Sequence, residues 1–310
     1  MSMQPLVSIV INNYNYGRFL RDAIDSALDQ SYPNTEVIAV DDGSTDDSRQ
    51  IIASYGPRII PRLKENGGQA SAFNAGFTAS RGEWICFLDS DDLFAPVKAQ
   101  AIVENANLFP EAALIAHALQ HCDGDGAPMK FGRFSFPSVR LVDDRARARR
   151  GKLSVTLPAT SGLALRRDLA KQVFPMPEDI TITADNYVKL AALGLAKVLF
   201  LPEGLATQRL HGQNAYTRVD DSEAMTILEA SLNIRIACRL RERFPYLRRL
   251  AWKQTGRAVG SLLSSGTPQA RQALRNVQRD CRLLEFTPSC LVWFAGAFLR
   301  SWIGRPVRLG

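Results

Sequence analysis

A run of apolar residues that ends in three carboxylates constrains the fold of this chain more than any other feature. Trp84–Leu88 (WICFL) is typical of a strand buried on both faces, as in a parallel sheet covered by helices. Open α/β sheets bind ligands beyond the carboxyl ends of their strands, and this end carries Asp89, Asp91 and Asp92. Crowded carboxylates repel one another unless a cation lies between them. Because oxygen ligands suit Mg²⁺ or Mn²⁺, which also bind phosphates, the segment predicts a divalent metal site that holds a diphosphate.

A purely structural interpretation of these acids is open at this point. Short acidic clusters are common in turns, and Asp caps helices well, so the segment could simply begin a helix near Pro96. An EF-hand is not indicated, because no Gly and distal Glu follow at the offsets that its calcium loop requires.

Strands and helices are expected to alternate along the first two thirds of the chain. The expected strands cover residues 6–11, 36–40, 58–61, 84–88, 113–118, 160–167 and 198–201. The expected helices cover residues 19–28, 45–55 (capped by Thr45) and 69–80, and a fourth begins at Pro96. This alternation indicates βαβ units and a mostly parallel sheet. Two of the strands end in paired acids, which supports a site at the strand ends more strongly than either pair alone.

Polar turns follow two further strands. Asp41 could accept a hydrogen bond from a base or a ribose hydroxyl, or the sequence Asp41–Ser44 (DDGS) could only form a turn. Asn66–Gly68 could likewise be a tight turn, or could let the backbone approach a phosphate closely. No GxGxxG follows the first strand and no GxxxxGK[ST] occurs, so dinucleotide-binding and P-loop folds are not indicated.

The composition is typical of a soluble globular protein whose cysteines are reduced. The 310 residues suffice for one large domain or a domain with an appendage, and 46% are hydrophobic and 22% charged. The five cysteines form no CxxC pair, which argues against a zinc ribbon or a disulfide framework. The first residues lack a basic n-region, and no segment offers the roughly 20 apolar residues that span a bilayer. We therefore expect a cytoplasmic location, with the inner face of the membrane as an alternative.

The positive charge is concentrated in the last third of the chain. Residues 1–217 carry a net charge of −2 and residues 218–310 a net charge of +9. The last third is expected to be helical, with one face formed by residues 225–236, a helix from Thr267–Pro268, and a final helix over residues 290–303. The final helix is rich in aromatic residues and flanked by arginines, which suits peripheral contact with anionic lipid. The same residues could pack on the sheet domain or in a dimer, and no nucleic-acid-binding module is recognisable.

Two stretches, VSIVINNYNYGRFL…VIAVDDGSTDDS and NGGQASAFNAGF…WICFLDSDD, resemble the family 2 glycosyltransferases of the GT-A fold. The resemblance covers residues 6–96 closely and extends more loosely to about residue 216. It implies an α/β GT-A fold with a mostly parallel sheet flanked by helices, and a helical C-terminal extension. The expected domains are residues 1–217, with a nucleotide-sugar-binding half (1–96) and an acceptor and catalytic half (97–217), and residues 218–310.

The resemblance also implies an inverting transferase that uses Mn²⁺ or Mg²⁺ and a nucleotide-diphosphate sugar, a UDP-sugar above all. The expected nucleotide-binding residues are Asn12, Tyr14, Asp41, Asp42, Gly68 and Asp89. The expected metal ligands are Asp89, Asp91 and His211, and the expected contacts on the sugar or acceptor side are Asp92, Ser161 and Gly162. A lone histidine is more often structural than a ligand, and that alternative stays open for His211.

Asp185 is the expected catalytic base. Inverting transfer needs a carboxylate that takes the proton of the acceptor hydroxyl. Ala184 stands where the family has a glutamate, but the following acid is kept as Asp185. Asp185 could also cap a helix, and Glu178 and Asp179 are rival candidates for the base.

Two departures from the family pattern leave the base specificity open. Asn12–Asn13 precede Tyr14, and Phe73 stands before Asn74 where an arginine is frequent. Residues 119–156 have little pattern and contain a basic cluster at residues 145–152, which suits either an acceptor contact or a solvated loop.

Transfer to a glycan or a lipid-linked acceptor in cell-surface polysaccharide biosynthesis is the expected activity, by analogy with the family. A nucleotide-sugar-binding regulatory or scaffold protein is the alternative, because Ala184 breaks the acidic pair. Sugar nucleotidyltransfer is less well supported, since residues 12–18 (NNYNYGR) do not supply the Gly-rich basic loop that it requires.

Overall fold

The computed structural model of the protein describes residues 4–130, 136–212, 214 and 222–280. The chain divides into two compact units. The first unit comprises Met1–Asp143 and Leu157–Asn214, and the second comprises Asp144–Thr156 and Ala215–Gly310. The second unit thus includes an internal segment within the range expected for the first domain. The functional halves expected at 1–96 and 97–217 remain a prediction.

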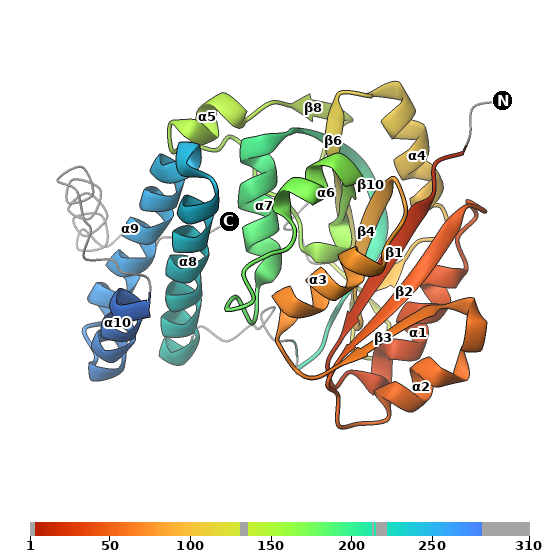
Figure 1. The fold of residues 1–310 in the computed structure, drawn as a ribbon, viewed down its shortest axis with the longest axis horizontal. Helices are drawn as coiled ribbons and strands as arrows, with labels where there is room; N and C mark the ends of the chain where they lie inside the picture. Colours follow the sequence, from red (N-terminus) through yellow and green to blue (C-terminus); the bar gives the residue numbers. More distant parts are fainter. Residues whose placement is uncertain (1–3, 131–135, 213, 215–221, 281–310) are drawn as a thin grey trace. The chain divides into compact units, whose positions relative to one another are not determined.

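In the described part of the first unit, ten strands form one mixed sheet. They are β1 (Val7–Asn13), β2 (Thr35–Asp42), β3 (Ile60–Lys64), β4 (Trp84–Asp89), β5 (Leu93–Phe94), β6 (Ala112–Asp123), β7 (Pro128–Met129), β8 (Arg140–Val142), β9 (Leu163–Arg166) and β10 (Lys197–Leu210). The main order is β3-β2-β1-β4-β9-β6-β10-β5 (Figure 1). The first four strands and the β6–β10 pair are parallel as expected. Short antiparallel strands are added at β5, β7, β8 and β9.

Helices cover both faces of this sheet. They are α1 (Gly17–Leu28), α2 (Ser48–Ser54), α3 (Gln69–Ala79), α4 (Lys98–Leu108), α6 (Arg167–Val173) and α7 (Ala184–Leu195), with single 3₁₀ turns η1 (Gly56–Arg58) and η2 (Thr160–Gly162). Side chains of a strand alternate between its two faces. Cys86 and Leu88 of β4 therefore join one core with residues of α1 and α4, whereas Phe87 packs against Phe73 of α3 on the opposite face, with ring centroids 4.9 Å apart.

Several element boundaries differ from the expected ones. Strand β3 begins at Ile60, because residues 56–58 form a 3₁₀ turn instead of a strand. Helix α4 begins at Lys98, two residues after Pro96. Strand β9 begins at Leu163, because Thr160–Gly162 forms the turn η2. Strand β6 continues to Asp123, beyond the expected end at residue 118, and pairs there with β7 and β10.

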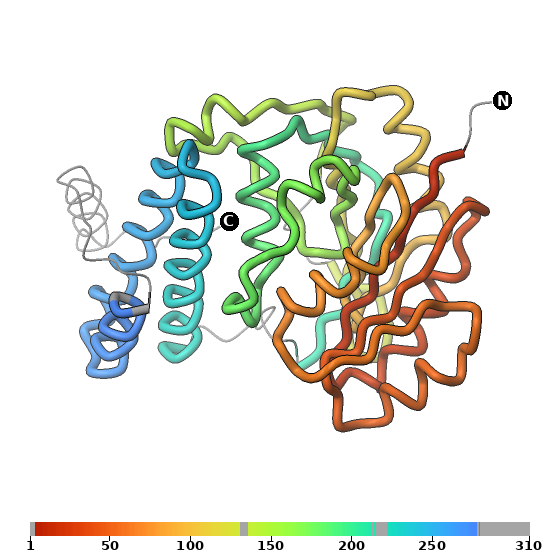
Figure 2. The backbone as a smooth tube through the Cα atoms, viewed as in Figure 1, coloured from red at the N-terminus to blue at the C-terminus, as the bar shows by residue number. Residues whose placement is uncertain are grey.

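The described part of the second unit is helical. It contains α5 (Arg145–Arg149), α8 (Glu223–Arg243), η3 (Pro245–Leu247), α9 (Arg248–Ser265) and α10 (Pro268–Asp280). Helices α8 and α9 run side by side (Figure 2), and their small and branched side chains, including Ile234 and Leu262, form a core with α10. No described helix is long and apolar enough to cross a membrane. The helix expected over residues 290–303 lies outside the described residues.

Candidate active site

The carboxyl ends of four neighbouring parallel strands bring the predicted polar residues to one edge of the sheet. The register places Asn12 of β1 opposite Asp89 of β4, and Asn13 of β1 opposite Asp41 of β2. Side chains join the same pairs. Asn12 Nδ2 donates to Asp89 Oδ1 at 2.8 Å, and Asn13 Nδ2 donates to Asp41 Oδ1 at 3.1 Å. The edge is therefore a continuous polar row.

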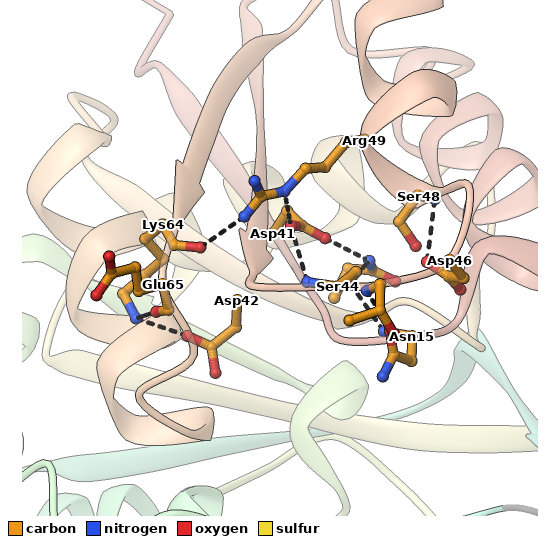
Figure 3. Close-up of polar contacts among 11 residues, drawn as sticks. Asn15, Asp41, Asp42, Ser44, Asp46, Ser48, Arg49, Lys64 and Glu65 are labelled. Carbon is orange, nitrogen blue, oxygen red and sulfur yellow. Dashed lines mark hydrogen bonds and ion pairs between the residues drawn. The ribbon is translucent and has the colours of Figure 1, made fainter.

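Asp41 is buried at the end of β2 and accepts several hydrogen bonds (Figure 3). Arg49 Nε donates to its Oδ2 at 2.8 Å, and the Ser44 amide donates to the same oxygen at 3.1 Å. Burial alone would raise the pKa of Asp41, but the hydrogen bonds from Ser44, Arg49 and Asn13 hold it below its usual value. The Asp41 side chain is thus held in one orientation, and these contacts favour its ionised form.

Asp42 follows Asp41 at the end of β2, and its carboxylate binds the loop before α3 (Figure 3). Lys64 Nζ donates to its Oδ1 at 2.6 Å, and the amides of Gly67 and Gly68 donate to its carboxylate at 3.0 and 2.7 Å. Gly68 has a φ of +85°, and a Cβ there would lie 2.7 Å from the Cα of Thr181. Residue 68 therefore needs to be glycine, both for its backbone conformation and for its close approach to Thr181.

The loop after β2 ties the N-terminus of α1 to that of α2. Asp46 Oδ2 accepts from the Gly17 amide at 2.8 Å, and its Oδ1 accepts from the Ser48 amide at 3.0 Å. The predicted cap, Thr45, instead donates its amide to Asn15 Oδ1 at 2.8 Å. Thr45 was thus the wrong cap, because the chain makes one more turn before α2 begins at Ser48. Tyr14 lies in the preceding turn with 47% of its surface exposed.

The three acids of Asp89–Asp92 have different surroundings. Asp92 is buried, and its carboxylate accepts from Ser161 Oγ at 2.6 Å and from the Arg209 amide at 3.0 Å. Asp91 Oδ2 lies 3.1 Å from His211 Nε2 and accepts from Asn214 Nδ2 at 3.2 Å. The pKa of Asp92 is well above its usual value because of burial and the charges of Asp91 and Asp89.

Two other carboxylates, Asp91 and Asp185, act on the pKa of Asp89. Its pKa is raised well above the usual value by burial, by Asp91 and by Asp185, while the Thr160 hydroxyl and Lys189 oppose the rise. The acids thus repel one another, as the sequence predicted. A positive charge between them would relieve that repulsion.

The donor set fits a cation that is shared with a substrate. Among the described residues, no three His, Cys, Asp or Glu side chains form a complete metal site. Asp91 and His211 nevertheless meet at one point, beside Asp89. Mg²⁺ and similar ions commonly take one or two carboxylates from the protein and complete their shell with water and substrate phosphates. His211 is fixed by the rings of Tyr16 and Phe19, whose centroids lie 5.6 and 4.6 Å from its own.

Asp185 lies in the first turn of α7 and not at its cap. The cap is Thr183, whose φ of 51° and ψ of 32° are left-handed and unusual for a β-branched residue. Lys189 Nζ lies 2.5 Å from Asp185 Oδ2. Ala184, which replaces an expected acid, is buried and donates its amide to Gln69 Oε1 at 2.8 Å.

Glu178, one of the two rival candidates for the base, lies against Asn74. Glu178 accepts from Asn74 Nδ2 at 3.1 Å, next to a second bond from the same amide group to the Met176 carbonyl. Asp185, by contrast, raises the pKa of Asp89 and therefore lies within electrostatic reach of the acidic cluster. Phe73, which stands where the family often has arginine, is a core residue that is 1% exposed.

Ser161 and Gly162 lie in the turn η2, beside the end of β4. Ser161 Oγ accepts from the Asp89 amide at 3.2 Å while it donates to Asp92. A Cβ at Gly162 would lie 2.7 Å from Pro158 Cγ, so the close packing of this turn requires glycine. Gln213, between His211 and Asn214, lies outside the described residues.

Four basic residues at this edge were not predicted. Arg49 and Lys64 pair with Asp41 and Asp42, Lys98 contacts the Ser161 carbonyl, and Lys189 pairs with Asp185. The spacing of Lys189, four residues after Asp185 on a predicted helix, was a usable signal. No local signal exists for the other three, because their partners are distant in sequence or belong to the backbone.

Known proteins resemble this chain in sequence. Residues 8–174 match the sequence model of glycosyl transferase family 2. An uncharacterized glycosyltransferase of Nostoc sp. is 39% identical over 222 residues, which are 67% of this chain and 66% of that protein. The putative teichuronic acid biosynthesis glycosyltransferase TuaG of Bacillus subtilis is 40% identical over 105 residues, or 33% of this chain and 42% of that one. The chain thus spans less than two thirds of the length of these relatives.

Solved structures share the fold at low sequence identity. TarS 1–349 of S. aureus, in complex with UDP, is 16% identical with a TM-score of 0.55, covering 98% of this chain and 93% of that one. A mannosyltransferase of Pyrobaculum calidifontis, in complex with GDP-Man and Mn²⁺, is 16% identical with a TM-score of 0.52, covering 97% and 87%. The expected GT-A fold is confirmed.

Proposed function

The chain belongs to glycosyl transferase family 2, and from this premise we propose that it moves a sugar from a nucleotide-diphosphate sugar to a hydroxyl of a glycan or lipid-linked acceptor, with inversion at the anomeric carbon. One observation carries the proposal. Asn12 hydrogen-bonds to Asp89, Asp91 lies 3.1 Å from His211, Asp185 pairs with Lys189, and the charges of Asp91, Asp185 and Lys189 all act on Asp89.

The nucleoside is bound at the ends of β1 and β2. Asp41 is ionised and fixed by Arg49, so it can accept from a base or a ribose without moving. Asp42 holds the glycine turn at Gly67–Gly68, which lets the backbone come close to the donor. A UDP-sugar is the proposed donor, in keeping with the UDP bound by the S. aureus neighbour.

Asp91 and His211 would hold a divalent cation, with Asp89 beside them. Such an ion, when bound, supplies positive charge to the diphosphate as it leaves. The residues themselves orient the site. Ser161 and the Arg209 amide fix Asp92, while Tyr16 and Phe19 fix the His211 ring. The Mn²⁺ in the mannosyltransferase of the same fold supports this choice of ion.

Asp185 acts as the base. It takes the proton of the acceptor hydroxyl while that oxygen attacks the anomeric carbon and the bond from that carbon to the diphosphate breaks. Lys189, at 2.5 Å, keeps the carboxylate in one place before the acceptor arrives. The name of the Bacillus relative supports an acceptor in cell-surface polysaccharide biosynthesis.

Asp185→Asn tests the assignment. Transfer from UDP-, GDP- and dTDP-sugars in the presence of Mn²⁺ should fall by about 10²–10⁴-fold, while nucleotide binding measured by calorimetry stays at the wild-type level. Asp179→Asn and Glu178→Gln test the two rival acids, and both variants should keep their activity. Near-normal turnover of Asp185→Asn would exclude Asp185 as the base. Binding of a sugar nucleotide by the wild-type protein without any transfer or hydrolysis would favour a regulatory or scaffold protein.

A further inference from the structure

Lys98 is a lysine with no exposed surface, at the first residue of α4. Its Nζ donates to the Ser161 carbonyl at 2.7 Å and lies 3.5 Å from the centroid of the Phe94 ring. In the part of the chain that the structure describes, Lys98 forms no ion pair. Lysine is almost never fully buried unless it is paired, so this position needs an explanation that packing alone does not give.

Two other titratable side chains, His117 and Cys86, are buried near Lys98. His117 is also fully buried, and burial together with the charge of Lys98 lowers its pKa well below the usual value. Burial raises the pKa of the Cys86 thiol. Burial also lowers the pKa of Lys98 to about 7, while Cys86 and Asp92 act in the opposite direction. Burial thus disfavours the charged form of Lys98, and the neighbouring carboxylate of Asp92 favours it.

The contact with Ser161 connects Lys98 to the acidic cluster. Ser161 Oγ donates to Asp92 at 2.6 Å and accepts from the Asp89 amide at 3.2 Å. The other oxygen of Asp92 accepts from the Arg209 amide. Asn214 then links the Arg209 carbonyl, at 2.9 Å, to Asp91. One network of hydrogen bonds thus connects Lys98 to Asp89, Asp91 and Asp92.

We propose that Lys98 is a positioning residue of the donor site, which holds the Ser161 turn in place behind the acids that bind the cation and the diphosphate. This inference rests on the proposed function. Lys98 does not touch the substrate. It acts through Ser161 and Asp92, much as partners behind metal ligands orient those ligands and tune the site.

Lys98→Met tests the proposal, because methionine keeps the length of the side chain and removes its charge and its donor. The matched control is Lys171→Met, at an exposed position of α6. Calorimetry would measure the binding of UDP, GDP and dTDP with MnCl₂ and with EDTA. Hydrogen exchange of a peptide that covers residues 157–165 would report on the turn, and melting temperatures would report on folding.

We expect Lys98→Met to weaken Mn²⁺-dependent nucleotide binding by about 10- to 100-fold. Binding in EDTA should not change, the amides of residues 157–165 should exchange faster, and the melting temperature should stay near that of the control. A merely structural lysine would lower the melting temperature and both kinds of binding together. Unchanged Mn²⁺-dependent binding would overturn the inference and leave the proposed function standing.

Two further outcomes remain decisive. If the wild-type protein binds none of the three nucleotides, the proposed function fails, and hydrogen exchange alone tests Lys98: unchanged exchange at residues 157–165 overturns its positioning role, and faster exchange supports it. If Lys98→Met does not fold, Ser161→Ala takes its place, since it removes the hydroxyl that joins the turn held by Lys98 to Asp92. Normal Mn²⁺-dependent binding by Ser161→Ala would then overturn the inference.

Discussion

Several acidic side chains at the site are held by basic side chains that follow them by between four and 22 residues. Asp41 is paired with Arg49, Asp42 with Lys64, and Asp185 with Lys189. Each acid is thereby fixed before a ligand binds, so little side-chain freedom is left to lose in the complex. The acids of Asp89–Asp92 are the exception, because they repel one another and have no described lysine or arginine side chain in ion-pair contact.

Lys189→Met should reduce turnover without preventing binding. The change removes the cation 2.5 Å from Asp185 and frees the carboxylate to rotate away from the acceptor. Misplacing a reacting group by about 1 Å can cost about 10²-fold, so we expect kcat to fall by about 10- to 100-fold. Steady-state kinetics against the exposed control Lys171→Met would measure the effect. A kcat equal to that of the control would show that Lys189 does not position Asp185.

Gly68→Ala should destabilise the protein more than Gly56→Ala. Both glycines have positive φ, +85° and +53°, but a Cβ at Gly56 meets nothing within 4 Å, whereas one at Gly68 collides with the backbone of Thr181. The free energy of unfolding should therefore fall by about 1–3 kcal/mol more for Gly68→Ala. Urea denaturation of the two variants measures the difference, and equal losses would mean that the loop near Thr181 moves away without cost.

At the scale of helices and strands, one side chain joins two helix N-termini. Asp46 accepts from Gly17 of α1 and from Ser48 of α2. Asp46→Ala should lower the free energy of unfolding by about 0.5–2 kcal/mol, the usual value of a cap. Asp47→Ala is the control, because Asp47 forms no capping hydrogen bond with its side chain.

The contribution of Asp46 should also depend on pH. Burial would raise its pKa, but hydrogen bonds from Ser48 and Gly17 hold the pKa below the usual value. The folded state thus favours the ionised form, so the contribution is complete above the unfolded pKa of about 3.9. It is lost as the pH falls through the lower pKa of the folded state. Urea denaturation at pH 7 and pH 3 should show a smaller difference between wild type and Asp46→Ala at pH 3.

The elements that could be predicted from the sequence are those whose signals are local. The buried run Trp84–Leu88, the strand that ends at Asp41–Asp42 and the glycine turn at Gly67–Gly68 each have a pattern within a few residues. The antiparallel pairing of β9 and the end of β6 do not, because both depend on strands distant in sequence. The role of Lys98 was likewise invisible, since its partner Ser161 is 63 residues away.

At the scale of the whole chain, net charge differs between the two units. The site lies in the first unit, whose residues 1–143 and 157–214 carry a net charge of −6, whereas residues 144–156 and 215–310 of the second unit carry +13. The described helices of the second unit have their own core. A lipid-linked acceptor would bring the enzyme to a membrane surface, and the basic last third of the sequence suits that location.

Removing residues 288–310 should reduce binding to anionic vesicles. These residues contain Arg300, Arg305 and Arg308, no acid, and the aromatic side chains Trp293, Phe294, Phe298 and Trp302. Each basic residue near an anionic surface contributes about 1 kcal/mol, and the aromatic side chains add apolar burial. The full chain should therefore sediment with phosphatidylglycerol vesicles at low salt, and the chain that ends at Thr287 should sediment far less.

The comparison needs two controls, because basic proteins adhere weakly to any anionic surface. Phosphatidylcholine vesicles should retain little of either protein, and the triple variant Arg300→Gln, Arg305→Gln, Arg308→Gln should separate charge from apolar contact. Added salt screens exposed charges over about 8 Å at 0.15 M, so binding that depends on the arginines should weaken as salt is raised. Equal sedimentation of the full and shortened chains would exclude residues 288–310 as the lipid contact and favour their packing within the protein or in a dimer.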